Sequence, residues 1–171
     1  MALRHFSTSA PALTLWHLAA YSLSRTEKKM IYTLSIKCVW GAYLKQPFER
    51  TIEVPDDMTL GELHDAIQDL TGFDNDHLFT FFMARGPTGK RTEVVETDEW
   101  DERHGRLYEI PLKRVFPLPQ NVKLFYLFDF GDDWTFQIGK RGGPKAGEFG
   151  TKYPRVVKAT GPKPIQYPRF G

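Results

Sequence analysis

Three aspartates in one short segment are the side chains of this chain best suited to chemistry. Asp129, Asp132 and Asp133 lie between two aromatic-rich apolar runs in KLFYLFDFGDDWTFQIGK, which begins at Lys123. Clustered carboxylates are ligands that suit Mg²⁺ or Mn²⁺, and such a site supports phosphoryl chemistry. One hypothesis is therefore a metal-dependent phosphoesterase or nuclease. Three further residues would complete that site if the fold brings them near: Asp74, Asp76 and His77.

A hairpin turn explains the same aspartates without chemistry, and we favour this interpretation. Asp132 and Asp133 would sit in the turn beside Gly131, and Asp129 would lie on the strand face opposite the apolar one. Aspartate at a turn commonly accepts hydrogen bonds from backbone N–H groups. No catalytic residue, metal or other cofactor is then assigned. The apolar positions on both sides of the turn would share one buried face: Leu124, Tyr126, Phe128, Phe130, Trp134, Phe136 and Ile138.

The C-terminal part of the chain is strongly basic. Residues 31–138 carry 19 acidic and 11 basic side chains, whereas residues 139–171 carry eight basic side chains against Glu148 alone. Flexible segments that mix cations and aromatic rings bind nucleic acids by counterion release and stacking. Alternatively, this segment folds back on the acidic body as an internal counter-charge. The candidate nucleic-acid-binding residues are Lys140, Arg141, Lys145, Lys152 and Arg155.

The histidines and the cysteine suggest no further site. None of the five histidines is spaced as a helical metal pair, and we expect His64 and His104 to be solvated. The single cysteine, Cys38, excludes an internal disulfide framework and favours a reducing, cytoplasmic setting. No apolar run is long enough to cross a bilayer, so we expect no membrane partner.

The elements that must position these residues follow from the hydrophobic periodicity. Alternating apolar residues predict strands over 31–40 and 48–54, the second with Glu49, Thr51 and Glu53 on a solvated face. A capping box at Thr59 and Glu62 begins a helix that Gly72 ends. Further strands are expected over 77–83, 107–110, 123–129, 134–139 and 155–159, with one helical turn near 111–118. This order predicts a single α+β domain, β-grasp-like, with a mixed, mainly antiparallel sheet.

Residues 1–29 differ in composition from the rest of the chain. They are rich in Ser, Ala and Leu and poor in acids. A transit peptide, a secretory signal and a misplaced start codon are three interpretations. We favour the third, because Glu27, Lys28 and Lys29 require a purine-rich stretch just before the Met30 codon, as in a bacterial ribosome-binding site. The domain is then expected to span residues 30–171.

The segment around the aspartates resembles the signature of the Ri-plasmid ORF-three-like family, some members of which are called "TnpR" passenger proteins of insertion elements. The signature residues, to which we assign a structural role, are Tyr126, Phe128, Phe130, Gly131 and Trp134. Supporting matches are Thr59-Leu60, Phe73-Asp74, His77-Leu78, Tyr153-Pro154-Arg155 and Gln166-Tyr167-Pro168. The chain departs from the family pattern at Phe136, where many members carry His.

The resemblance covers about residues 31–168 and implies an α+β fold, a bacterial or archaeal origin and an association with plasmids and transposons. It implies no particular activity. Together with the basic C-terminal segment, it suggests a non-catalytic accessory or binding protein of mobile-element type that engages nucleic acid or another protein. The sequence leaves the oligomeric state open.

Overall fold

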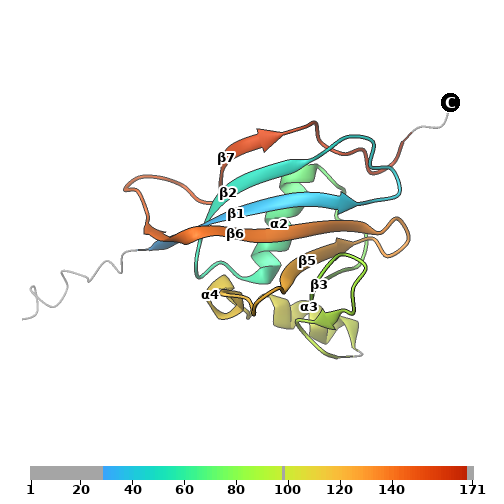
Figure 1. Cartoon of the computed structure of the whole chain (residues 1–171), viewed down its shortest axis with the longest axis horizontal. Coiled ribbons are helices and arrows are strands. Elements are labelled where there is room, and N and C mark those ends of the chain that lie inside the picture. Colours follow the sequence, from blue (N-terminus) through green and yellow to red (C-terminus); the bar gives the residue numbers. More distant parts are fainter. Residues whose placement is uncertain (1–28, 98, 169–171) are drawn as a thin grey trace, which may run out of the picture.

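Seven strands form one sheet in the computed structural model, which describes residues 29–97 and 99–168 (Figure 1). The strands are β1 (Met30–Trp40), β2 (Glu49–Pro55), β3 (Phe79–Ala84), β4 (Thr92–Glu93), β5 (Lys123–Phe128), β6 (Trp134–Ala146) and β7 (Arg155–Thr160). The helices are α2 (Leu60–Thr71), α3 (Trp100–Leu107) and α4 (Leu112–Val115). The strand order is β4-β3-β5-β6-β1-β2-β7, so β4 and β7 are the two edges.

The predicted α+β domain is confirmed, but the predicted mixture of strand directions is wrong. Each of the six strand pairs among the described residues is antiparallel, including the central pair of β1 and β6. The fold does not confirm the β-grasp-like assignment. Strand–strand–helix–strand order alone does not fix strand direction, because the direction of the central pair depends on where the distant β6 enters the sheet.

Strand β1 lies in the middle of the sheet and follows the predicted alternation over most of its length. Tyr32, Leu34, Ile36 and Cys38 are buried in the main core, but Trp40 is 60% exposed. The pairing of β1 with β6 shifts register between Cys38 and Trp40, at the end of the strand. This irregularity takes Trp40 out of the core.

The second face of β2 is less solvated than its alternation predicts. Thr51 is buried and Glu53 is 5% exposed, although both were expected to face water. The cause is the edge strand β7, which pairs with β2 and places Arg155 opposite Glu53. Sequence alternation along β2 contains no information about this later strand.

Helix α2 begins and ends where the sequence predicts. Thr59 and Glu62 form the reciprocal capping box, and Gly72 ends the helix in the left-handed conformation at φ 76°. Leu60, Leu63 and Ile67 are fully buried, and α2 lies across one face of the sheet, behind β1 and β6 in Figure 1. The helix therefore presents its other side to solvent.

Residues 107–110 do not form the predicted strand. Leu107 is the last residue of α3, residues 108–110 follow it, and the carbonyl of Ile110 accepts a hydrogen bond of 3.0 Å from the backbone N–H of Leu60. Pro111 pairs with Thr59 in an isolated bridge. The segment thus attaches to the start of α2 rather than to the sheet. The helical turn predicted after it is α4.

The hairpin of β5 and β6 supplies much of the core. Six of the seven predicted apolar positions are at most 1% exposed, but Phe130 is 52% exposed and packs edge-on against Trp100. Phe130 lies in the turn between the two strands, where alternation no longer applies. In the part of the chain that the structure describes, no helix is long and apolar enough to span a membrane.

Candidate functional site

The side chain of Asp129 accepts hydrogen bonds from the backbone of the hairpin turn, whereas that of Asp133 accepts one from the Thr135 hydroxyl. The Oδ1 atom of Asp129 accepts hydrogen bonds from the N–H groups of Gly131 at 2.9 Å and Asp132 at 3.3 Å. The Asp129 carbonyl accepts a further bond of 2.7 Å from the N–H of Asp133. Asp129 and Asp133 both have positive φ, at 57° and 54°. These are the contacts expected of turn aspartates.

The remaining candidates for a metal site converge only in part. The Nε2 atom of His77 lies 3.4 Å from Oδ2 of Asp129 and 3.9 Å from Oδ1 of Asp76. Asp74 instead uses its backbone N–H, which donates to Oε1 of Gln166 at 2.8 Å. Within residues 29–97 and 99–168, no group of three or more His, Cys, Asp or Glu side chains is placed to hold a metal ion.

Two residues of the C-terminal segment complete this cluster. The hydroxyl of Tyr167 donates to Oδ2 of Asp76 at 2.7 Å and lies 3.0 Å from Nε2 of His77, while Nε2 of Gln166 donates to Asp76 at 3.1 Å. Burial and the hydrogen bond to Asp76 raise the pKa of Tyr167 to about 12. The cluster fastens residues 166–167 to the loop before β3. The match of Gln166-Tyr167 to the family pattern did not by itself indicate this role.

The basic C-terminal segment is largely part of the sheet. Residues 139–146 extend β6, and residues 155–160 form β7. Arg141 pairs with Glu49 at 2.7 Å, Lys145 pairs with Glu53, and Arg155 contacts Glu53 at 2.5 Å. Arg155 also makes a bidentate pair with Glu148, at 2.7 and 2.8 Å. Arg141, Lys145 and Arg155 thus act as internal counter-charges to acidic side chains, which is one of the two interpretations left open by the sequence.

The five predicted nucleic-acid-binding residues do not form one patch. Lys140 neighbours Leu34 in the pairing of β6 with β1, and its ammonium lies 5.0 Å from the ring centroid of Tyr32, on the side of the main core. Arg141, the next residue along the strand, points to the opposite face and contacts Ser35 and Glu49. Lys152 is exposed in the segment between β6 and β7.

Glu53 is the centre of the ion pairs on the open face. Burial acts to raise its pKa, but the hydrogen bonds and charges of Lys145 and Arg155 outweigh burial and lower the pKa below its usual value. The carboxylate is thus ionised where it joins β2, β6 and β7. This arrangement stabilises the sheet and leaves fewer cations available to an external anion.

His64 is buried, so the prediction that it is solvated is wrong. It is 1% exposed, stacks on Phe79 with ring centroids 3.5 Å apart, and places Nδ1 2.7 Å from the hydroxyl of Tyr126. Nε2 of Gln68 donates to that hydroxyl, also at 2.7 Å, so the hydroxyl proton goes to His64. Burial lowers the pKa of His64 to about 4. The ring is a neutral acceptor that holds α2 on β5.

His104 is also less solvated than predicted. Its ring is half-buried and packs edge-on against Phe79 and Tyr108, at centroid distances of 4.9 and 5.5 Å. Helix α3 carries it there, and the sequence did not predict this helix. His104 thus packs α3 against the main core.

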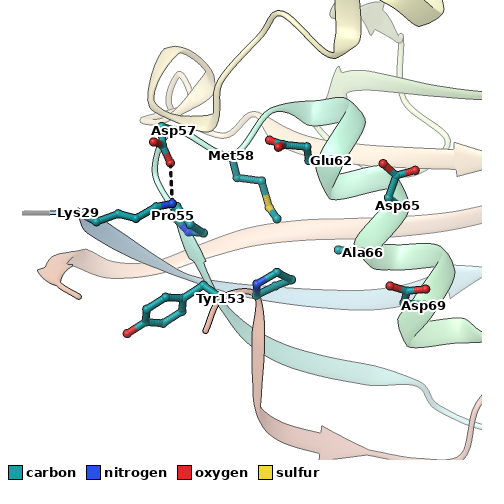
Figure 2. A pocket seen from close by; sticks show the side chains of 10 residues that line it. Lys29, Pro55, Asp57, Met58, Glu62, Asp65, Ala66, Asp69 and Tyr153 are labelled. Atoms are coloured by element: carbon teal, nitrogen blue, oxygen red, sulfur yellow. Dashed lines mark ion pairs between the residues drawn. The ribbon is translucent and has the colours of Figure 1, made fainter. Parts of the chain in front are cut away.

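An acidic cleft of about 440 Å³ lies beside α2 (Figure 2). Glu62, Asp65 and Asp69 follow one side of the helix, Met58 points into the space between, and Tyr153 lies across from the helix. The complete lining is Lys29, Pro55, Asp57, Met58, Glu62, Asp65, Ala66, Asp69, Tyr153 and Pro154. Four carboxylates thus face one ammonium among the described residues of the cleft. Its volume falls within the range of ligand sites in proteins.

Several of these carboxylates have partners within the protein. Glu62 accepts from the backbone N–H of Thr59 at 2.7 Å, Asp65 accepts from the hydroxyl of Tyr108 at 3.1 Å, and Asp57 lies 3.8 Å from Lys29. None of these contacts except the last neutralises a charge. The sequence holds a sign of this surface that we missed: acids at positions 62, 65 and 69 recur at helical spacing.

A second, more apolar cavity of about 190 Å³ continues the cleft along α2. It shares Ala66, Asp69 and Pro154 with the first cavity, and it adds Ile52, Leu70, Arg155 and Val156. The two cavities form one groove between α2 and the segment that leads into β7. We call it the α2–β7 groove. One end is acidic and the other is apolar.

The fold and these surfaces define an antiparallel α+β protein with a groove beside its main helix. The chain belongs to the family described as "Plasmid pRiA4b ORF-3-like protein", whose sequence profile matches residues 31–166. This confirms the resemblance noted in the sequence.

The chain is also similar to one curated protein in sequence and to one solved structure in fold. It is 29% identical over 113 residues to the uncharacterized protein y4hQ of Sinorhizobium fredii, a match that covers 66% of this chain and 54% of that protein. The chain thus spans about half the length of this relative. The crystal structure of MM3350, a protein of unknown function from Methanosarcina mazei Go1, has a TM-score of 0.57 and 24% identity, and covers 77% of this chain and 69% of that one. This likeness concerns the fold alone.

Proposed function

We propose that this protein is a non-catalytic accessory protein of a mobile element and that its partner is another protein rather than a nucleic acid. The family's description refers to a plasmid, which supports the association with mobile elements. The observation that carries the choice of partner is the internal pairing of Arg141, Lys145 and Arg155 with Glu49, Glu53 and Glu148.

Electrostatics favours the same choice. A nucleic acid gains affinity when its phosphates meet unpaired cations and release counterions. Here a phosphate would have to compete with a carboxylate that already contacts each of those three cations. The α2–β7 groove carries the opposite charge, so it would repel a phosphate backbone and attract a cationic surface.

Nucleic-acid binding tests this proposal directly. Fluorescence anisotropy measures binding to labelled duplex DNA, single-stranded DNA and RNA. Binding through phosphates would weaken steeply between about 50 and 200 mM salt, and we expect no such salt-sensitive binding. The informative variant is Lys140→Gln with Arg141→Gln, and its matched control is Lys113→Gln with Arg114→Gln on α4. Salt-sensitive binding that the first variant loses and the second keeps would overturn the proposal.

If a partner protein binds at the groove, photo-cross-linking to it should depend on where in the chain the photoreactive residue is placed. A photoreactive residue at position 69, in the groove, is expected to cross-link a protein in host cells, whereas the same residue at position 101, on α3, gives no matching product. Equal products at both positions would contradict a partner bound at the groove.

The metal-dependent phosphoesterase or nuclease remains the rival function. It predicts that Mg²⁺ or Mn²⁺ raises the melting temperature of the protein and that Asp132→Asn abolishes the rise. On our proposal, the parent and the Asp132→Asn variant respond alike to both metals. A metal-dependent rise confined to the parent would replace the binding function with the enzymatic one.

A further inference from the structure

We propose that the α2–β7 groove binds an extended segment of the partner protein that carries arginine or lysine at alternate positions, followed by an apolar residue. This inference rests on the proposed function and specifies the chemistry of the partner. It combines three properties of the groove: its charge, the spacing of its carboxylates and its apolar end.

The charge of the groove selects a cationic ligand. Asp57, Glu62, Asp65 and Asp69 line the first cavity, and Lys29 is the one cation among its described lining residues. Lys29 lies 3.8 Å from Asp57, at the end of the cleft remote from Asp69. In the described chain, no lysine or arginine lies at ion-pairing distance from the carboxylates along α2. The ring of His64 lies 4.0 Å from Asp65, but it is neutral.

The spacing of the carboxylates selects an extended conformation. Asp65 and Asp69 are four residues apart on α2, which is about 6 Å along the helix axis. Alternate side chains of an extended strand point the same way and lie about 6.6 Å apart. A basic–x–basic segment that runs along the helix thus places one cation near each carboxylate.

The far end of the groove selects an apolar side chain. Ile52, Leu70 and Val156 line the second cavity, and Val156 is 50% exposed. The guanidinium of Arg155, which also lines this cavity, is occupied by Glu53 and Glu148, so Asp69 is the carboxylate of this lining that is open to a ligand cation. The basic residues of the ligand therefore lie toward Asp65, and its apolar residue lies toward Val156.

A labelled peptide tests the inference on the full chain. The probe is fluorescein-labelled Gly-Arg-Gly-Arg-Gly-Leu-Gly, in which both Arg and the Leu point to the same side of an extended chain, and its control carries Gln in place of each Arg. We expect the probe to bind and the Gln peptide to bind about tenfold more weakly, as expected for the loss of two partly exposed ion pairs. In NMR spectra of the protein, the shifts caused by the probe should concentrate in residues 60–71 and 153–156.

Matched variants separate the groove from general charge. Asp65→Asn with Asp69→Asn is expected to weaken probe binding about tenfold. Asp101→Asn with Glu109→Gln removes the same charge outside the groove and is expected to leave binding unchanged. Absence of probe binding, equal weakening by both variants, or equally tight binding of spermine would overturn the inference.

The two proposals fail in different ways. A chain that binds neither the probe nor nucleic acid, yet cross-links a protein at position 69, loses this inference and keeps the proposed function. A chain whose nucleic-acid binding requires Lys140 and Arg141 loses the proposed function, whatever the peptide does.

Discussion

Gly61, the second residue of α2, lies directly beneath the ring of Tyr108. A Cβ atom at this position would lie 2.3 Å from Cγ of that ring. The contact brings the Tyr108 hydroxyl to Asp65, and burial, with the charge of Asp65, raises the pKa of Tyr108 to about 12. A single missing side chain thus lets the segment after α3 pack against α2.

We expect Gly61→Ala to destabilise the protein by about 1 to 3 kcal/mol, because the ring of Tyr108 must move away from the helix. Urea unfolding measures this change. Gly105→Ala is the matched control: its Cβ would meet nothing within 4 Å, and alanine favours the interior of α3 by about 0.5 to 1 kcal/mol. Equal destabilisation of the two variants would contradict the packing argument.

The buried ring of His64 predicts a dependence of stability on pH. Its pKa is about 4 in the folded protein and near the ordinary 6.5 after unfolding, so between these values the unfolded chain binds more protons. The stability associated with neutral His64 is complete above about pH 6.5 and falls by about 3 kcal/mol as the pH drops to 4. Asp65, His104 and Tyr126 lie beside this ring, and the charge of His104 adds to the lowering of the His64 pKa by burial.

Comparison of parent and variant isolates the contribution of His64. Its replacement by Gln removes the titrating group, so the free energy of unfolding should lose this slope between pH 6.5 and 4. His104→Gln, which keeps His64, should retain the slope of the parent. Parallel curves for the parent and the His64→Gln variant would show that another group is responsible.

At the scale of elements, Glu53 joins three strands. Its folded-state pKa is lowered, so its stabilisation is complete above its unfolded pKa of about 4.3 and is lost as the pH falls through the folded value. We expect Glu53→Gln to lower the free energy of unfolding by about 2 kcal/mol at neutral pH, since hydrogen bonds to charged groups are lost.

The difference between Glu53→Gln and the parent should shrink toward zero as the pH falls below the lowered folded-state pKa of Glu53, where the parent carboxylate is also neutral. Denaturant unfolding at a series of pH values measures it. Glu109→Gln, at an exposed position on no strand, serves as the control and should stay within about 0.5 kcal/mol of the parent. A difference that persists unchanged in acid would rule out the ionised form as its source.

Local patterns predicted individual elements well. The capping box of Thr59 and Glu62, the left-handed Gly72 and the burial of alternate residues in β5 each depend on residues close together in the sequence, and each forms as predicted. Where partners are distant, prediction failed. The burial of Glu53 depends on Arg155, and that of His64 on Phe79 and Tyr126, and no local period encodes such pairings.

In the candidate site too, features with local partners could be predicted and features with distant partners could not. A hairpin turn with a capping aspartate was predicted from neighbouring residues, but the turn positions were given to Asp132 and Asp133, whereas the side chain that accepts the turn N–H groups is that of Asp129. The α2–β7 groove was missed because its walls come from α2 and from residues 153–156. The acids of α2 were visible in the sequence, but the surface opposite them was not.

At the scale of the whole molecule, the C-terminal segment fastens the loop that joins α2 to β3. Lys163 donates to the carbonyl of Asp69 at 3.0 Å, and the buried Gln166 binds the backbone of Asp74. Replacement of Gln166 by Ala leaves that N–H without its partner, which costs about 1 to 3 kcal/mol. We expect faster hydrogen exchange in residues 73–78, measured by mass spectrometry.

Ile165→Ala is the control for this prediction. Ile165 belongs to the same segment but is 63% exposed, so its truncation should leave exchange in residues 73–78 unchanged. If Gln166→Ala also leaves that exchange unchanged, then the segment does not hold the loop.

The order of the strands has a consequence for biosynthesis. Strand β1, residues 30–40, pairs with β6, residues 134–146, so about a hundred residues must be translated before the middle of the sheet can close. At typical elongation rates this takes roughly 5 to 20 seconds. During that interval both outer edges of the hairpin of β1 and β2 are unpaired, since β1 awaits β6 and β2 awaits β7. The nascent chain is then a natural substrate for chaperones, and its contact order predicts slow folding even after release.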